Sequence, residues 1–227
     1  MLRPDTGYRF RNWDKTLESR PERFYRPDSE DEVLEIVREA NDAGGTVRTF
    51  GAGHSWSPLV LTDGTLINLD KLYRIVSMDV KRQRVTVQAG IRLKELNQIL
   101  AKHGLGMSNL GSIGEQSIAG AISTATHGTG LRLGGLHTQI VGMNLITGSG
   151  QLLGISEGTD DELMAAARVG LGALGIITQV TIQCVPYYNL ERKAQPLPFD
   201  EVLDRIDDLV NDNDRVRLYC RTKAMRP

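Results

Sequence analysis

The residues of this chain best suited to chemistry lie in the segment VRTFGAGHSWSPL, residues 47–59. The first four residues read as the end of a short strand, and two glycines flanking one alanine then lead to His54. Glycines let consecutive backbone N–H groups surround an anion, and Ser55 adds a hydroxyl donor. An imidazole at such a position could be a general base, a metal ligand or a nucleophile. Taken alone, the loop does not distinguish these roles from an exposed histidine without any role.

Two of the reactions that such a loop could support find no match in the sequence. No neighbouring His, Cys or carboxylate stands at ligand spacing from His54, so we expect no metal site. A serine hydrolase would need the pattern G-x-S-x-G around Ser55 or Ser57, and that pattern does not occur. Metal-dependent and serine-hydrolase chemistry are therefore not expected.

A second glycine-rich segment, SIAGAISTATHGTG at residues 117–130, again places small residues and hydroxyls beside a histidine, His127. The two segments are about 70 residues apart, and neither contains the lysine of a phosphate-binding P-loop. Together they suggest a long, phosphate-containing ligand lying between two lobes. The alternative is close packing of small residues, which would have to apply to both segments independently.

The sequence GLGALG, residues 170–175, matches the dinucleotide pattern G-x-G-x-x-G letter for letter. That pattern binds phosphate only where a strand precedes it and a helix follows it. Here a predicted helix precedes it and a predicted strand follows it. We therefore interpret the segment as a tight turn from a helix into a strand, and we reject a Rossmann fold.

The segments that must position these loops show clear periodicity. The sequence at residues 26–45 predicts a helix that is capped by Asp28 or Ser29 and ends at Gly44 and Gly45. Its apolar face consists of Val33, Ile36, Val37 and Ala40, and a strand follows at residues 46–50. We also predict helices at residues 92–104, 117–124 and 160–170, strands at 65–70, 74–79, 84–90 and 175–186, and a hairpin at 139–156.

The character of the sequence changes near Pro186, because no glycine occurs after Gly175. We predict a strand at residues 187–194, a charged amphipathic helix at 198–213 and another strand at 215–221. A domain boundary near Pro186 follows, with the last part of the chain beginning a second unit.

Composition excludes several other classes of function. The 227 residues carry a formal net charge of −1, so we expect no nucleic-acid partner. The basic run VKRQRV, residues 80–85, is more simply a hairpin turn. No apolar run approaches the roughly 20 residues of a membrane span, and the first ten residues lack the apolar core of a signal peptide. With only Cys184 and Cys220, neither a disulfide framework nor a zinc cluster is expected, and we predict a cytoplasmic protein.

From residue 13 to residue 186 the chain resembles the FAD-binding domain of the vanillyl-alcohol-oxidase (p-cresol-methylhydroxylase-type) flavoproteins. Within them it is most similar to the sugar-1,4-lactone oxidases of the L-gulonolactone and D-arabinonolactone oxidase type. The matching motifs, in order, are VRTFGAGHSWS, LTDG, QAGIRLKELNQIL, STATHGTG and VGLGALGIITQVTIQCVP. The resemblance implies an α+β fold with a two-lobed FAD-binding domain at residues 1–186, its lobes at about 1–75 and 76–186. The start of an incomplete cap domain would follow at 187–227.

The same resemblance implies roles for individual residues. His54 aligns with the histidine that many members link covalently to the flavin 8α-methyl carbon. Ser112 would lie near the flavin N5 atom, and the main chain of Ile176 would contact the adenine end. Residues that would wrap the FAD pyrophosphate are Thr49, Phe50, Gly51, Ala52, Gly53, His54 and Ser55. Residues that would line the second side of the dinucleotide are Ser117, Gly120, Thr124, Ala125, Thr126 and His127.

The implied reaction is oxidation of an aldono-1,4-lactone by hydride transfer to flavin N5, with O₂ or another electron acceptor. The resemblance also implies that Gly111 occupies a position where alanine shields the flavin from O₂ in a related plant dehydrogenase, so that glycine there favours an oxidase. An alditol oxidase is the alternative. A catalytically silent FAD-binding fragment is another, because the family's second domain and its His-Trp-x-Lys signature are absent from this sequence. Substrate-side catalytic residues are expected in that second domain, so none is identified here.

Overall fold

The computed structural model describes residues 2–220 of the chain, and it confirms the predicted mixture of helices and sheets. A three-stranded parallel sheet has the order β3–β5–β4. Its strands are β3 (Arg23–Tyr25), β4 (Val47–Phe50) and β5 (Thr65–Asn68). All four residues of β5, the central strand, are buried. This sheet holds the end of β4, from which the glycine loop begins.

A larger antiparallel sheet has the order β10–β9–β11–β7–β6. Its central strand alternates buried and half-buried residues, as expected for a sheet with one covered face. The five strands are β6 (Ile75–Asp79), β7 (Arg84–Gln88), β9 (Ile140–Ile146), β10 (Leu152–Ser156) and β11 (Ile176–Gln183). The basic run at residues 80–85 includes the β6–β7 turn, as predicted, and β9 and β10 form the predicted hairpin.

Helix α1 (Glu30–Asp42) has the predicted boundaries and the predicted buried face. Of the two cap candidates, Ser29 is the cap: its hydroxyl accepts a hydrogen bond from the Glu32 N–H at 3.2 Å. The Glu32 carboxylate in turn accepts from the Asp28 N–H at 2.9 Å, which completes a capping box one residue out of the usual register. The helix start is therefore fixed by local sequence alone.

Helix α1 also connects the smaller sheet to the larger one. The Glu30 carboxylate accepts hydrogen bonds from the Thr178 hydroxyl on β11 and from the Asn144 side chain on β9, and Arg38 donates to the Gly150 carbonyl at 3.0 Å. A single hydrophobic core joins α1 and β5 with the five-stranded sheet. The two sheets are thus held in a fixed relation, and the segments between them can form one site.

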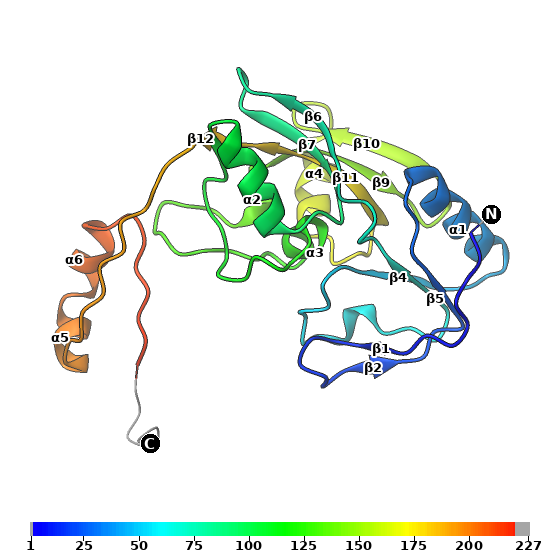
Figure 1. Cartoon of the computed structure of the whole chain (residues 1–227), viewed down its shortest axis with the longest axis horizontal. Helices are drawn as coiled ribbons and strands as arrows, with labels where there is room; N and C mark the ends of the chain where they lie inside the picture. Colours follow the sequence, from blue (N-terminus) through cyan, green and yellow to red (C-terminus); the bar gives the residue numbers. More distant parts are fainter. Residues whose placement is uncertain (1, 221–227) are drawn as a thin grey trace.

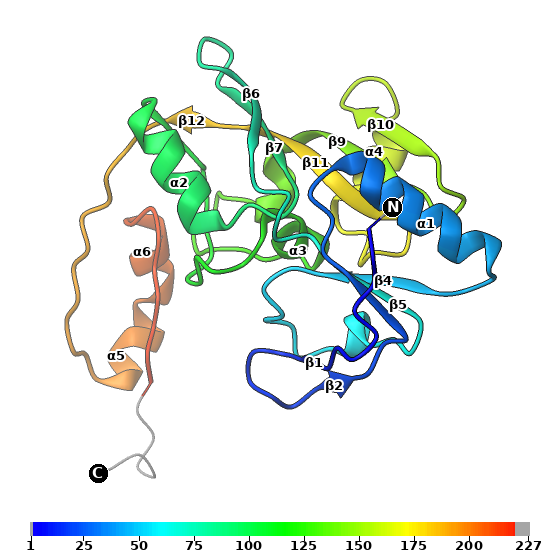
Figure 2. The ribbon, with the colours of Figure 1, turned by 45° about the vertical axis from the view of Figure 1, so that its right-hand side comes forward.

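Three more helices lie near the larger sheet (Figures 1 and 2). They are α2 (Leu93–Lys102), α3 (Ile118–Ser123) and α4 (Asp161–Arg168), all close to the predicted ranges. Helix α3 consists almost entirely of small or aliphatic residues and buries three of them. Because it lacks long side chains, another segment can approach its exposed side closely.

Short elements that periodicity did not predict complete the main body. Two pairs of two-residue strands are β1 (Phe10–Arg11) with β2 (Glu18–Ser19), and β8 (Leu105–Gly106) with β12 (Val185–Pro186). Two short 3₁₀ helices are η1 (Pro58–Val60) and η2 (Leu136–Gln139). The strand predicted for residues 175–186 is therefore interrupted: β11 ends at Gln183, and β12 then pairs with a different strand.

The predictions for the C-terminal part were only partly right. The single helix predicted at residues 198–213 is two short helices, α5 (Phe199–Asp204) and α6 (Ile206–Asn211), with a break at Arg205. Residues 187–194 and 215–220 form no strand, and residue 221 lies outside the described residues. Alternating apolar residues indicate a strand only where a neighbouring strand can take the backbone hydrogen bonds.

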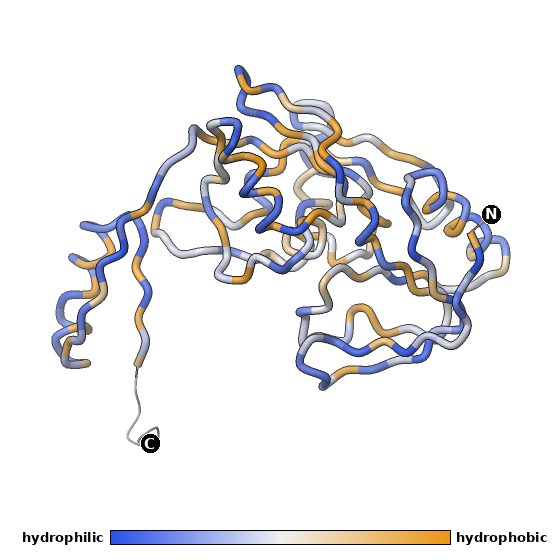
Figure 3. The backbone as a smooth tube through the Cα atoms, viewed as in Figure 1, coloured by the Kyte–Doolittle hydropathy of each residue, from blue (hydrophilic) through white to orange (hydrophobic). Residues whose placement is uncertain are grey.

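This C-terminal arm, residues 187–220, projects to one side of the main body in both ribbon views (Figures 1 and 2), and its Tyr188, Arg215 and Arg217 donate hydrogen bonds to the segment at residues 107–112. Hydrophobic residues are dense along the strands of the larger sheet, whereas they alternate with hydrophilic ones in the arm (Figure 3). Neither α5 nor α6 contains a buried residue, and Phe199 and Leu203 are exposed. The exposed apolar surface predicts poor solubility of the isolated chain.

Replacement of Leu96 by alanine tests the packing of α2. Leu96 is fully buried in the main core, so we expect the free energy of unfolding to fall by about 2–5 kcal/mol. Urea unfolding followed by circular dichroism measures this change. The exposed Gln98 on the same helix provides the control: Gln98→Ala should change stability by less than about 0.5 kcal/mol. Equal effects of the two substitutions would contradict the observed packing of α2.

Within residues 2–220, no helix combines the length and the apolar character needed to cross a bilayer.

Candidate functional site

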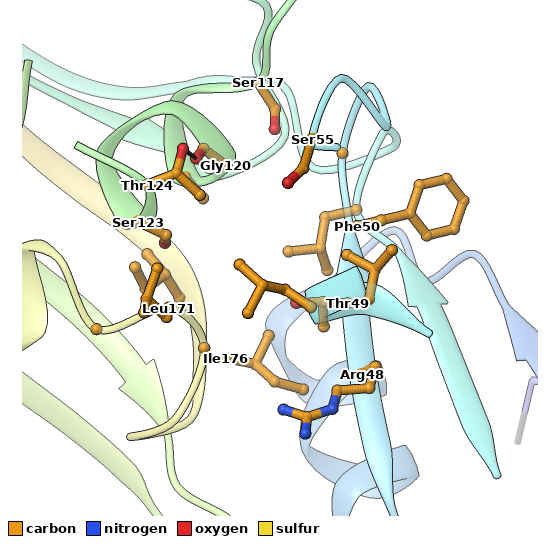
Figure 4. A pocket seen from close by; sticks show the side chains of 18 of the residues that line it. Arg48, Thr49, Phe50, Ser55, Ser117, Gly120, Ser123, Thr124, Leu171 and Ile176 are labelled. Atoms are coloured by element: carbon orange, nitrogen blue, oxygen red, sulfur yellow. Dashed lines mark hydrogen bonds between the residues drawn. The ribbon is translucent and has the colours of Figure 1, made fainter. Parts of the chain in front are cut away.

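A cavity of about 440 Å³ lies between the two glycine-rich segments singled out in the sequence. One wall is the end of β4 with the loop after it, residues 47–60, and the opposite wall is α3 with its flanking residues, 116–126. The turn at residues 170–177 contributes a third wall (Figure 4). The volume falls within the range of cofactor and small-molecule sites in proteins.

The glycine loop after β4 is supported from behind by the N-terminal segment. The Trp13 N–H donates a hydrogen bond to the Gly53 carbonyl at 2.8 Å, and the Asn12 side chain donates to the Ser55 carbonyl at 3.1 Å. Asn12 is only 4% exposed, so it is a fixed part of this support. Gly53 has a φ of +68°, which favours glycine at this position. Sequence reasoning did not identify Asn12, because no motif marks it.

The two glycine-rich segments meet at Gly51 and Ser117. A Cβ atom added at Gly51 would overlap the Ser117 hydroxyl and lie 2.8 Å from Ser117 Cβ. Glycine is therefore required at position 51 for close approach of the loop to the start of α3. The same contact shows that the segments predicted to enclose one ligand do lie on facing sides of one cavity.

A chain of polar contacts fixes the distance between these walls. The Asn68 side chain donates to the Gly51 carbonyl at 3.4 Å and accepts from the Asp70 N–H at 3.1 Å. The Asp70 carboxylate accepts from Arg92 Nη2 at 2.6 Å, and the backbone of Arg92 forms a β-bridge with Ser117. The glycine loop and the start of α3 are thus connected through side chains of β5 and of the residue before α2.

His54 lies half-buried in the cavity wall, next to two exposed tryptophans. Its imidazole centroid is 5.4 Å from that of Trp13, and Trp56 lines the cavity two residues further on. Trp13 and Trp56 are 65% and 66% exposed, although tryptophan is usually well buried. Among residues 2–220, no side chain or backbone group forms a hydrogen bond with the His54 ring. A ring with both nitrogens unengaged is available to a ligand.

One carboxylate lies within electrostatic reach of His54. Lys94 donates a hydrogen bond to Glu115 at 2.7 Å and so lowers the pKa of that carboxyl below its ordinary value. Limited burial opposes this effect, and the positive charges of Lys94, Arg92 and His54 reinforce it. Glu115 is therefore ionised at neutral pH.

Most of the residues predicted to bind the cofactor line this one cavity. They are Thr49, Phe50, Gly51, Ala52, Gly53, His54, Ser55, Ser117, Gly120, Thr124, Thr126 and Ile176. That each of them contacts FAD remains a prediction.

Four of the predicted residues lie outside the lining. Gly111 packs against Thr126, and the Ser112 hydroxyl is hydrogen-bonded to Arg217 of the C-terminal arm. His127 is exposed, and its Nδ1 is 2.8 Å from the Gly128 carbonyl oxygen. Ala125, with a φ of +54°, forms the turn that ends α3. These four residues are next to the lining segments in the chain but do not themselves line the cavity.

Sequence reasoning missed part of the lining. The turn Gly170–Gly175 follows α4 and precedes β11, which confirms the order that excluded a Rossmann fold. The same turn nevertheless lines the cavity through Leu171 and Leu174, and β4 contributes Arg48. In the sequence, the signal that could have assigned this turn to the cavity was the presence of two leucines within a glycine-rich turn.

No cluster of three or more His, Cys, Asp or Glu side chains able to hold a metal ion occurs within the described part of the chain.

Comparisons with known proteins agree with this geometry. A family model described as "FAD binding domain" matches residues 21–156, more than half of the chain. L-gulonolactone oxidase of Bos taurus is 40% identical over 217 residues, which cover 96% of this chain and 49% of that protein. L-gulono-1,4-lactone dehydrogenase of Mycobacterium tuberculosis is 41% identical over 208 residues, covering 92% of this chain and 48% of that protein.

D-arabinono-1,4-lactone oxidase of Eremothecium gossypii is 38% identical over 217 residues, covering 94% of this chain and 41% of that protein. The chain thus spans about half the length of the curated relatives it matches. Among solved structures, a His121Ala mutant of cholesterol oxidase from Brevibacterium sterolicum aligns with a TM-score of 0.70 at 23% identity. The alignment covers 78% of this chain and 37% of that one, and at this identity it shows a shared fold. The chain therefore belongs to the family of FAD-binding domains, as its motifs predicted.

Proposed function

We propose that this chain is the FAD-binding part of an oxidoreductase that oxidises an aldono-1,4-lactone, with O₂ or another electron acceptor. The observation that carries the proposal is the cavity closed by the glycine loop and α3, in a chain similar over nearly its whole length to proteins named as lactone oxidases or dehydrogenases. The partition into two lobes and a cap, and a cytoplasmic location, are part of the same proposal.

The residues of the cavity are suited to holding FAD. Backbone N–H groups of the loop at residues 51–55 would bind the pyrophosphate, since consecutive N–H groups form an anion-binding concavity. Gly51 keeps this backbone open to a ligand, because a side chain there would be forced against Ser117. When bound, FAD supplies the capacity to accept a hydride from a carbon that carries a hydroxyl.

His54 has a distinct role in the proposal. Its ring nitrogens form no hydrogen bond with the described residues, and its imidazole lies in the cavity wall. A neutral imidazole is a competent nucleophile near pH 7, and holding it against its target supplies much of the needed activation. We therefore propose that a ring nitrogen of His54 bonds to the flavin 8α-methyl carbon. The imidazole N–H bond and one methyl C–H bond would break, and their two hydrogens with two electrons would reduce the flavin, which O₂ or another electron acceptor would then reoxidise.

Titration of the purified chain with FAD tests the binding part of the proposal. Of the two tryptophans in the sequence, Trp56 lines the cavity and Trp13 lies 5.4 Å from His54 between ring centroids, so bound flavin should quench most of the intrinsic tryptophan fluorescence. We expect saturable quenching with one FAD per chain, and a yellow protein after gel filtration. A chain that binds no flavin under conditions where its circular dichroism shows a folded protein would contradict the proposal.

Anaerobic mixing of the FAD-loaded chain with substrates tests the proposed oxidation reaction. L-gulono-, L-galactono- and D-arabinono-1,4-lactone, together with an alditol, should be compared for their ability to bleach the flavin absorbance near 450 nm. Bleaching by a lactone supports the proposed activity, and preferential bleaching by the alditol would replace it with alditol oxidation. Stable FAD binding without bleaching by any of them would identify a silent FAD-binding fragment.

A further inference from the structure

Arg48 stands out among the residues that line the cavity. It is the one Asp, Glu, Lys or Arg side chain in the described lining, and it is exposed. Within residues 2–220 it has neither an ion-pair partner nor a side-chain hydrogen bond, whereas the nearby Arg23 pairs with Glu39 at 2.9 Å. An unpaired guanidinium facing a ligand cavity has its donors and its planar face available.

The direction of the cavity indicates which part of a ligand Arg48 would meet. Figure 4 shows Arg48 beside Ile176 at one end, and Ser55 with Ser117 at the other. The glycine loop begins three residues after Arg48, which corresponds to about 10 Å along a strand. In FAD the pyrophosphate separates the flavin half from the adenosine half. If the loop binds the pyrophosphate and His54 faces the flavin, then the adenosine half extends toward Arg48.

A second feature of the cavity is suited to a planar base. Leu171 and Leu174 of the turn after α4 line the cavity and are 48% and 39% exposed. Leu171 has a φ of +51°, a conformation that is uncommon for residues other than glycine. Such backbone strain concentrates at ligand-binding positions. Apolar side chains on one side and a guanidinium on the other would match the two faces of an adenine ring.

We propose that Arg48 recognises the adenosine half of FAD, and that it makes this site select FAD over FMN and riboflavin. The inference rests on the proposed binding of FAD, and it adds a residue that contacts the adenosine half of the cofactor. A guanidinium stacks on aromatic rings and also donates hydrogen bonds to ribose or to adenine nitrogens. Both interactions require the adenosine half, which FMN and riboflavin lack.

Dissociation constants of FAD, FMN and riboflavin test this proposal. They should be measured by tryptophan quenching in a His54→Ala background, so that binding stays reversible. We expect Arg48→Gln to weaken FAD binding about five- to thirtyfold, the usual effect of losing contacts with a charged group. FMN and riboflavin binding should change less than about twofold. Arg48→Lys should retain part of the FAD affinity, because it keeps the charge but not the planar group.

Arg20→Gln is the matched control, since Arg20 is an exposed arginine outside the cavity lining. It should leave all three constants unchanged. Equal weakening of all three flavins by Arg48→Gln would overturn the proposal in favour of a structural role. Equal weakening of FAD and FMN binding, with riboflavin binding unchanged, would also overturn the proposal, because it would show that Arg48 contacts a phosphate rather than the adenosine half. An unchanged dissociation constant for FAD would overturn it as well. Failure of the unsubstituted chain to bind FAD would instead overturn the proposed function, and this inference with it.

Discussion

Replacement of His54 by alanine is expected to abolish acid-stable attachment of flavin. In the unsubstituted protein, flavin should remain with the precipitated chain after acid treatment, close to one flavin per chain. His54 is the histidine in the cavity lining, and its ring is unengaged by the described residues. The variant should therefore release all of its flavin as free FAD. Absorbance of the supernatant and of the redissolved pellet measures the partition.

The variant should still bind FAD reversibly, because the backbone of the glycine loop does not depend on the imidazole. His103→Ala provides the control: His103 is exposed just after α2 and outside the cavity lining, so acid-stable flavin should be retained. Release of free FAD from the acid-treated unsubstituted protein would rule out the covalent bond. It would leave the proposal of FAD binding intact.

Replacement of Gly51 by alanine is expected to weaken FAD binding about 10- to 100-fold. The added Cβ would overlap the Ser117 side chain, so α3 and the loop must move apart. Inserting a methyl group into a tightly packed contact typically costs about 1–3 kcal/mol, and each 1.4 kcal/mol corresponds to about tenfold in affinity. Titration with FAD in the His54→Ala background measures the loss.

A compensating substitution makes this prediction specific. Adding Ser117→Gly to Gly51→Ala removes the atoms that the new Cβ would meet, and should recover much of the lost affinity. Glycine is tolerated at a helix start, and the Ser117 side chain makes no capping hydrogen bond there. Gly148→Ala, in the β9–β10 turn where a Cβ would meet no atom within 4 Å, should leave binding unchanged. If Gly51→Ala and Gly148→Ala bind FAD equally well, the loop and α3 do not approach as described.

Elements with a strong local signal were predictable from the sequence. Helix α1 matches in its boundaries and in all four residues of its buried face, because capping groups and apolar spacing are encoded within a few residues. The same holds for the β9–β10 hairpin. The strands predicted in the C-terminal arm were wrong, since a strand depends on a partner that local sequence does not specify.

In the candidate site, too, residues within short motifs were predictable from the sequence, whereas residues brought in from distant segments were not. The sequence identified two small-residue segments and His54, because glycines, hydroxyls and a histidine in that order are unusual and have few uses. It did not identify Asn12, which supports the glycine loop from 43 residues away in the chain. Nor did it assign the turn at residues 170–175 to the cavity, since its letters alone describe only a turn.

What the sequence determined by itself is therefore the fold class, the family and the two segments that enclose the cavity. The fold class and the family were implied by the resemblance that five ordered motifs carry, and the two segments were evident from their own composition, which lies within short stretches of chain. Only the tertiary structure decided that Gly51 touches Ser117, that Arg92 and Asp70 connect the two walls, and that Arg48 faces the far end of the cavity. Such contacts join residues distant in sequence, and they are set by how the two sheets pack around a shared core.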